Sequence, residues 1–161
     1  MNRDVLFMGI DVAVPLTNDQ CKSLEKSNYK FVCRYYTDCS NPSQLWKLLS
    51  RAEAQMISNN DLDIIAVYES NKGLIKTYSE ETGKKDCINA IKCAENIGQP
   101  ANTTIYFAIN SRFLVTKNYN IHDIFNYFTG INEQMKLYER TTECEGWNLG
   151  IYGSYSIIEY I

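Results

Sequence analysis

Short apolar runs that suit β-strands alternate along this chain with segments whose apolar residues recur at helical spacing. This alternation constrains the fold more than any other feature. Runs such as IIAV, inside the third of these strands, have no polar face and are typical of parallel strands. Strand–helix alternation predicts an α/β fold built on a parallel sheet. We expect five strands, near Phe7–Ala13, Lys30–Tyr36, Asp63–Glu69, Thr103–Ile109 and Trp147–Ser154.

Capping signals mark the start of the first two helices. Thr17 and Gln20 have the spacing of a capping box, in which the threonine hydroxyl accepts from a backbone amide and the glutamine reaches back. This box predicts a helix that runs to about Ser27. Ser50 and Glu53 have the same spacing and predict a second helix.

Two longer helices are expected in the second half of the chain. Gly83 precedes the first, and Gly98 followed by Pro100 is a stop signal for it. Asn120 is expected to cap the second. The apolar residues predicted to face the core are Cys87, Ala90, Ile91, Ala94 and Ile97 in the first helix, and Ile121, Ile124, Phe125, Phe128 and Ile131 in the second.

Bulk properties limit the class of protein. A chain of 161 residues suits one domain, so we treat residues 1–161 as a single unit. The net charge of −3, without a basic stripe, argues against nucleic acid as a partner. No apolar run is long enough to cross a membrane. The start, MNRDVLFMGID, does not resemble a signal peptide, which predicts a cytoplasmic protein or an exported domain without its signal.

Metal ligands are scarce in the sequence. The six cysteines contain no Cys-x-x-Cys pair, and His122, at a predicted helix start, is the only histidine. We therefore expect no metal and no other cofactor. Most of the cysteines are expected to be reduced thiols that fill the core.

Three of the predicted strands end in one polar side chain of carboxylate size. Asp11 follows the first strand, Glu69 closes the third, and Asn110 follows the fourth. Parallel α/β sheets bind their ligands where the carboxyl ends of the strands enter the helices. A buried carboxylate costs free energy unless an interaction offsets it. The three positions together predict a site at this end of the sheet.

Several stretches carry a family resemblance. The segments GIDVAVP, FVCRYYT, KLLSRAEAQMISNNDLDIIAVYES, GKKDCINAIKCAENIGQPANTTIYFAIN and NLGIYGSYSII occur in the order and chemistry of a known domain. The chain resembles, over nearly its whole length, the Rv2525c-like glycoside-hydrolase-like TIM-barrel domain, which is related to Chalaropsis-type lysozymes. The resemblance implies a (β/α) barrel and a site that engages cell-wall glycan such as peptidoglycan.

The resemblance also implies roles for particular positions. Asp11 and Glu69 match the acidic residues at the ends of the first and third strands, and Arg34 and Tyr35 match an Arg-Tyr pair on the second. The fourth strand departs from the family pattern. Asn110 and Arg112 stand where family members have an acidic pair, which supplies the catalytic carboxylates of the related lysozymes. The departure puts hydrolysis in doubt, because an asparagine neither donates nor accepts a proton near neutral pH.

We therefore predict a glycan site with two remaining candidate catalytic carboxylates, Asp11 and Glu69, since glycosidases use a carboxyl pair. The predicted substrate contacts are Asn110, Arg34, Tyr35, Tyr106 and Tyr152. Two alternatives stay open. One is a catalytically inactive glycan-binding or interaction module. The other is a receiver-like signalling domain that depends on Mg²⁺.

Chain length conflicts with a complete barrel. A TIM barrel typically needs about 250 residues, whereas about five strand–helix units are visible here. The leading prediction is a parallel barrel-type fold that lacks its last strands. Its open edges would favour a homo-oligomer. The alternative is a five-stranded, flavodoxin-like doubly wound sheet, for which this length is natural.

Overall fold

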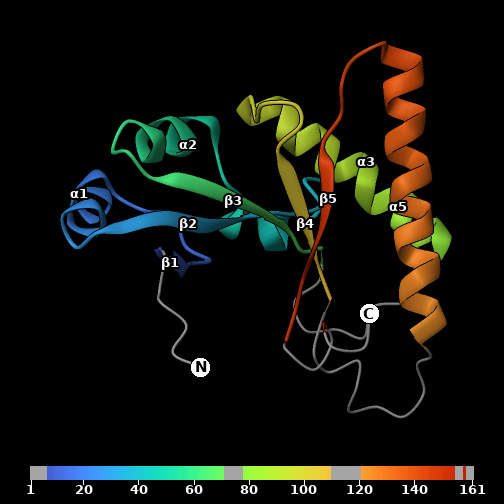
Figure 1. The fold of residues 1–161 in the computed structure, drawn as a ribbon, viewed down its shortest axis with the longest axis horizontal. Coiled ribbons are helices and arrows are strands. Elements are labelled where there is room, and N and C mark those ends of the chain that lie inside the picture. The colour runs from blue at the N-terminus through green and yellow to red at the C-terminus, as the bar shows by residue number, and fades with distance from the viewer. Residues whose placement is uncertain (1–6, 71–77, 110–120, 155–157, 159–161) are drawn as a thin grey trace.

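The computed structural model describes residues 7–70, 78–109, 121–154 and 158. Its five strands form one parallel sheet that is flanked by helices (Figure 1). The strands are β1 (Met8–Asp11), β2 (Tyr29–Tyr36), β3 (Asp63–Tyr68), β4 (Thr104–Ala108) and β5 (Asn148–Tyr152). The helices are α1 (Asn18–Lys26), the 3₁₀ helix η1 (Pro42–Lys47), α2 (Arg51–Ser58), α3 (Glu80–Ile97) and α5 (Ile121–Thr142).

The strand order decides between the two predicted folds. Strands that follow each other in the chain are also neighbours in the sheet, in the order β1-β2-β3-β4-β5. A flavodoxin-like or receiver-like sheet must reverse its winding direction at a switch point, so both of these alternatives are wrong. The barrel-type prediction is confirmed. Within the described residues β1 pairs with β2 alone and β5 with β4 alone, so the sheet is open.

Helices cover one face of the sheet. The residues Val32, Tyr36, Ala66, Ile105 and Phe107 alternate along β2, β3 and β4 and belong to the buried core. Right-handed connections that all advance in one direction place their helices on the same face. Because side chains alternate between the faces of a strand, the intervening positions, which include the side chains of Asp11, Tyr35 and Glu69, lie on the other face. That face is the inner face of a barrel.

The predicted capping signals are largely confirmed. Thr17 caps α1 and the complete capping box with Gln20 is present. Ser50 caps α2, and its hydroxyl accepts a hydrogen bond of 3.1 Å from the amide of Glu53. The second half of that box is different, because the Glu53 carboxylate accepts from the amide of Leu16 instead, at 2.9 Å. The helix η1 was not predicted.

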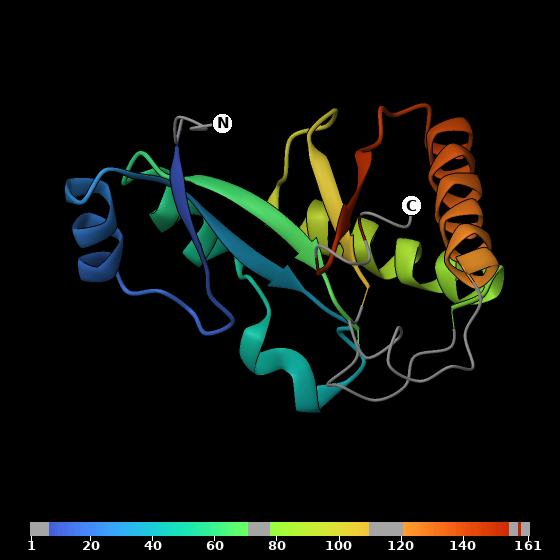
Figure 2. The same ribbon diagram turned by 60° about the horizontal axis from the view of Figure 1, so that its bottom comes forward.

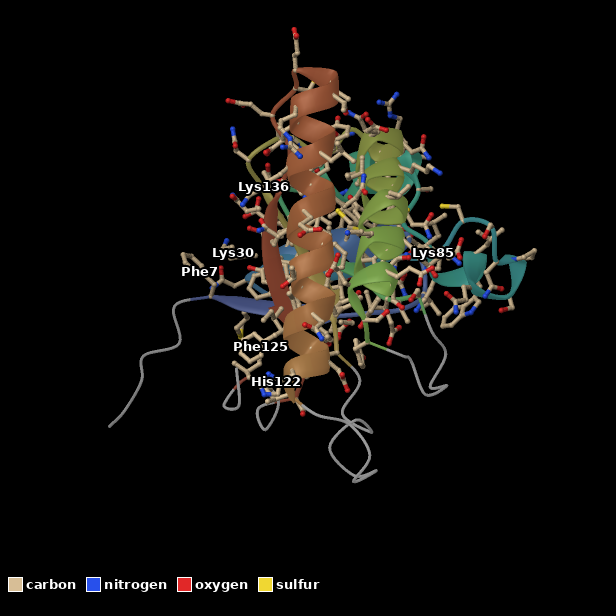
Figure 3. All side chains as sticks on the ribbon, turned by 90° about the vertical axis from the view of Figure 1, so that its right-hand side faces the viewer. Phe7, Lys30, Lys85, His122, Phe125 and Lys136 are labelled. Carbon is tan, nitrogen blue, oxygen red and sulfur yellow. The ribbon has the colours of Figure 1, made fainter. Side chains whose placement is uncertain are left out.

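The two long helices, α3 and α5, lie side by side (Figures 1 and 3). Their contact depends on two glycines. A Cβ on Gly83 would lie 2.0 Å from the carbonyl oxygen of Tyr127, and one on Gly130 would lie 2.0 Å from that of Glu80. Gly83 was predicted to precede α3, but it lies within the helix, which Ser79 caps. The helices therefore cross with their backbones in contact.

Other predictions for these helices have mixed outcomes. Gly98 ends α3 with a positive φ of 79°, as the stop signal predicted. Phe125 was predicted to face the core, but it is 47% exposed (Figure 3), since α5 turns Ile124 and Tyr127 toward the core instead. His122 lies in the first turn of α5 and is exposed. Asn120 lies outside the described residues. None of the helices that the structure describes is both long and apolar enough to cross a membrane.

Candidate functional site

Asp11 is the centre of a polar cluster at the carboxyl ends of the strands. The hydroxyl of Tyr35, on β2, donates to both carboxylate oxygens of Asp11, at 2.8 and 3.0 Å. The hydroxyl of Tyr152, at the end of β5, donates to Oδ2 of the same carboxylate. One carboxylate on β1 thus receives hydroxyls from the neighbouring strand and from the strand at the far edge of the sheet.

Glu69 joins this cluster through a buried lysine. The Nζ of Lys47, at the end of η1, lies 2.5 Å from Oε2 of Glu69. The same ammonium lies 5.3 Å from the centre of the Tyr35 ring, within the range of a cation–π contact. The Lys47 side chain is 3% exposed and that of Glu69 is 39% exposed. The two predicted carboxylates are therefore connected through Lys47 and Tyr35.

The tyrosines of the cluster remain hydrogen-bond donors over a wide pH range. Burial, followed by the hydrogen bond to Asp11, raises the pKa of Tyr35 well above its usual value. Burial and the same carboxylate also raise the pKa of Tyr152. A protonated tyrosine donates to a carboxylate, so the two hydroxyls satisfy part of the hydrogen-bonding capacity of the Asp11 carboxylate. Asp11 itself stays exposed. The cluster therefore presents to solvent one carboxylate that two tyrosine hydroxyls hold in place.

The carboxyl ends of β2, β3, β4 and β5 converge at one end of the sheet (Figure 2). The hydrogen bond between Tyr152 and Asp11 brings the end of β1 to the same place. Asp11 and Glu69 therefore lie at a common end of the sheet, as predicted. Asn110 and Arg112, the two departures from the family pattern, lie outside the described residues. The placement of Asn110 beside Asp11 and Glu69 therefore stays a prediction.

Arg34 lies behind the cluster and is completely buried. Its Nε and Nη2 donate to the two carboxylate oxygens of Glu53, at 2.7 and 2.9 Å. Its Nη1 donates to the carbonyl oxygens of Val12, at 2.9 Å, and Lys47, at 3.3 Å. The prediction that Arg34 contacts substrate must be corrected, because every donor group of the guanidinium is directed at protein. Arg34 is a positioning residue that fixes the segments after β1 and η1.

Tyr106 also departs from its predicted role. It lies on β4 beside Gly150, where a Cβ would meet the tyrosine ring at 2.4 Å. It lines a cavity of about 550 Å³ that includes Asp63 and Thr104, the first residues of β3 and β4. This cavity is therefore at the amino ends of the strands, opposite the Asp11 cluster. The structure does not bring Tyr106 together with Asp11 and Tyr35 as a group.

Three buried charged residues were missed by sequence reasoning, namely Lys47, Glu53 and Asp86. Asp86, on α3, accepts hydrogen bonds from the hydroxyls of Tyr127, at 2.8 Å, and Tyr68, at 3.2 Å. It thereby ties α3 to α5 and to the end of β3. Buried charges of this kind are rare unless paired, and no local pattern predicted their burial.

The part of the chain that the structure describes contains no group of three or more His, Cys, Asp or Glu side chains placed to hold a metal ion. The expectation of no cofactor stays a prediction.

The sequence model of the Rv2525c-like, glycoside hydrolase-like domain matches residues 22–161. The chain belongs to this family. Among its relatives is the uncharacterized protein FadG of Bacillus subtilis (strain 168), 32% identical over 142 residues, with 88% of this chain and 23% of FadG covered. YbfG of the same strain is 26% identical over 150 residues, with 91% of this chain and 20% of YbfG covered. The chain therefore spans about a fifth to a quarter of these relatives.

Two solved structures share the fold of this chain. The Tat-secreted protein Rv2525c of Mycobacterium tuberculosis, in complex with L-tartrate, superposes with a TM-score of 0.64 at 18% identity, covering 94% of this chain and 69% of that chain. An uncharacterized protein of B. stearothermophilus gives a TM-score of 0.61 at 22% identity, covering 91% and 60%. The predicted family and its TIM-barrel-like fold are thus confirmed, with the sheet of this chain open.

Proposed function

We propose that this domain binds a cell-wall glycan, such as peptidoglycan, at the carboxyl ends of its strands, and that Asp11 is the principal contact. The observation that carries the proposal is an exposed carboxylate, that of Asp11, which the hydroxyls of Tyr35 and Tyr152 hold in place. Carboxylates accept hydrogen bonds from sugar hydroxyls, and amphipathic aromatic rings suit the faces of sugar rings. Membership of a glycoside hydrolase-like family agrees with such a ligand.

The fold neighbour Rv2525c is known to hold small polar molecules in its crystals. It has been crystallised in complex with L-tartrate and in complex with HEPES. Tartrate carries hydroxyl and carboxylate groups, as acidic cell-wall sugars do. In this chain, Asp11 would accept hydrogen bonds from the hydroxyl groups of such a ligand.

Hydrolysis by Asp11 and Glu69 is the second candidate, and their location at the same end of the sheet favours it. Glycosidases need one carboxyl group that donates a proton and one that acts as nucleophile or base. Asp11 accepts hydrogen bonds from two hydroxyls, and Glu69 pairs with the ammonium of Lys47. Both carboxylates are arranged as acceptors, so binding without turnover is the leading proposal.

Sedimentation with purified peptidoglycan tests the proposal. Wild-type protein is expected to co-sediment, and Asp11→Asn is expected to lower the affinity about tenfold, since a charge-assisted hydrogen bond is worth about 1.5 kcal/mol or more. Asp63→Asn, at the opposite end of β3, is the matched control and should bind as wild type does. Binding that Asp11→Asn leaves unchanged would overturn the proposed site.

The same incubation separates the two candidates. If new reducing ends appear with wild-type protein and disappear in both Asp11→Asn and Glu69→Gln, the domain is a hydrolase and these residues are its carboxyl pair. Binding without release of reducing ends would support the glycan-binding module.

A further inference from the structure

A pair of cysteines lies outside the Asp11 cluster. We propose that Cys39 and Cys93 form a reversible disulfide under oxidising conditions, which fastens the connection between β2 and η1 to helix α3. Their Sγ atoms are 3.6 Å apart, although the residues are separated by 54 positions in the chain. Both thiols donate toward the carbonyl oxygen of Thr37, at 3.7 Å from Cys39 and 3.5 Å from Cys93.

The surroundings allow the two sulfurs to meet. A disulfide bond is about 2.05 Å long, so the sulfurs must approach each other by roughly 1.5 Å. Cys93 is held within the core by α3, whereas Cys39 is exposed on the connection after β2. Hydrogen bonds from Ser40, with a smaller contribution from the positive charges of Lys85 and Lys92 on α3, lower the pKa of Asp38. The connection therefore already lies against the helix to which the disulfide would attach it.

Exposure fixes the order of the reaction. The thiolate of Cys39 attacks one sulfur of a low-molecular-weight disulfide, such as oxidised glutathione, and the S–S bond breaks to release one small thiolate, which takes up a proton. Cys93 then loses its proton to solvent and attacks Sγ of Cys39, which displaces the second small thiolate. Two protein thiols are oxidised and one small disulfide is reduced to two thiols. Burial, with Cys39 as a second cause, raises the pKa of the Cys93 thiol to about 12, so Cys93 reacts second.

The cross-link would act on residues 37–47, the segment that runs from the end of β2 through η1 to the Asp11 cluster. Within that segment Gln44 donates to the carbonyl oxygen of Ser70, at 2.5 Å, and Lys47 pairs with Glu69. Fixing the start of the segment to α3 limits how far η1 can move from β3. Closing a loop of this length also restricts the unfolded chain, which stabilises the folded state. The proposal does not depend on the identity of the ligand at Asp11.

Thiol mapping of the whole chain tests the proposal. The protein is incubated with oxidised glutathione or with dithiothreitol, its free thiols are alkylated under denaturing conditions, and the peptides are analysed without reduction. We expect a peptide pair that joins Cys39 to Cys93 after oxidation only, and a rise of several degrees in Tm. Both changes should be absent in Cys39→Ser and present in Cys144→Ser, which removes another exposed thiol.

Two results of the mapping, both obtained with wild-type protein alone, would contradict the proposal. Cys39 that keeps glutathione as a mixed disulfide while Cys93 remains open to alkylation would overturn the proposal. Linkage of Cys39 to a cysteine other than Cys93 would do the same. A Tm that rises equally in Cys39→Ser would show that the stabilisation arises elsewhere.

Discussion

The carboxylate of Asp11 accepts a hydrogen bond from the hydroxyl of Tyr152, although the two residues lie 141 positions apart on the two edge strands of the sheet. A flat five-stranded sheet would hold its edges about 19 Å apart, since neighbouring strands are about 4.8 Å apart. The contact therefore requires a sheet that curls strongly at its carboxyl end. The curl gives the open sheet its barrel character and creates the Asp11 cluster at the same time.

Removal of the Tyr35 hydroxyl tests the energetics of this cluster. We expect Tyr35→Phe to lower the free energy of unfolding by about 1 kcal/mol, because one hydroxyl–carboxylate hydrogen bond is lost while the exposed Asp11 is rehydrated. Urea denaturation measures the change. Tyr106→Phe, on the same face of the sheet, should alter the midpoint less. Equal effects of the two substitutions would contradict the assigned role of Tyr35.

The buried pair of Arg34 and Glu53 predicts a larger effect. Glu53→Ala leaves the completely buried guanidinium without its carboxylate, and such losses cost about 3–5 kcal/mol. Denaturation in urea should show this decrease, whereas Glu25→Ala, on the exposed surface of α1, should change the stability by no more than about 0.5 kcal/mol. A Glu53→Ala protein as stable as wild type would mean that Arg34 is neutralised by another group.

The contact between α3 and α5 reverses the usual effect of a glycine replacement. Alanine is favoured over glycine inside a helix by about 1 kcal/mol, but the Cβ of Gly130→Ala would lie 2.0 Å from a backbone oxygen that cannot rotate away. We expect a net loss of about 1–3 kcal/mol, because the two helices must separate. Thermal unfolding of Gly130→Ala beside the exposed Asn126→Ala measures it. A stabilised Gly130→Ala would contradict the close crossing.

Alkaline pH should destabilise the fold. Burial raises the pKa of Tyr36, Tyr68 and Tyr127, and it raises the pKa of the Cys87 and Cys93 thiols to about 12. In the unfolded chain thiols ionise near pH 8.5 and tyrosines near pH 10. The stabilisation is complete below those values and is lost as the pH rises from them toward the folded-state values.

The free energy of unfolding, measured from about pH 8 to about pH 11, should therefore decrease. The decrease arises first because the thiols ionise in the unfolded chain and then because the tyrosines do. Tyrosinate absorbance, recorded in parallel, should appear for the buried rings only as the protein unfolds. Full ionisation of all tyrosines near pH 10 in protein that remains folded would contradict the burial of these rings.

Local patterns in the sequence were sufficient for the elements but not for their arrangement. The alternation of apolar runs and capping signals predicted the strands and the start of α1, because both depend on neighbouring residues. Strand order depends on which strands pair, and no local pattern encodes it. The family resemblance favoured the barrel before any strand order was known.

The site was predicted only in part, because local patterns do not show which residues meet across the fold. Asp11 and Glu69 were found because polar residues that close apolar strands stand out. Lys47 was missed because a lysine in a short 3₁₀ helix has the pattern of a surface residue, although Glu69 and the ring of Tyr35 stabilise its charge in the interior. Glu53 was interpreted as a capping residue because its local spacing fits, but the buried Arg34 offers a stronger partner.

Isothermal titration calorimetry with a soluble peptidoglycan glycan fragment tests the central claim most directly. Wild-type protein and Asp63→Asn should bind the fragment with equal affinity, and Asp11→Asn should bind about tenfold more weakly or not at all. Equal binding by wild-type protein and Asp11→Asn, with loss of binding in Asp63→Asn, would place the ligand in the cavity at the amino ends of the strands and would contradict the account.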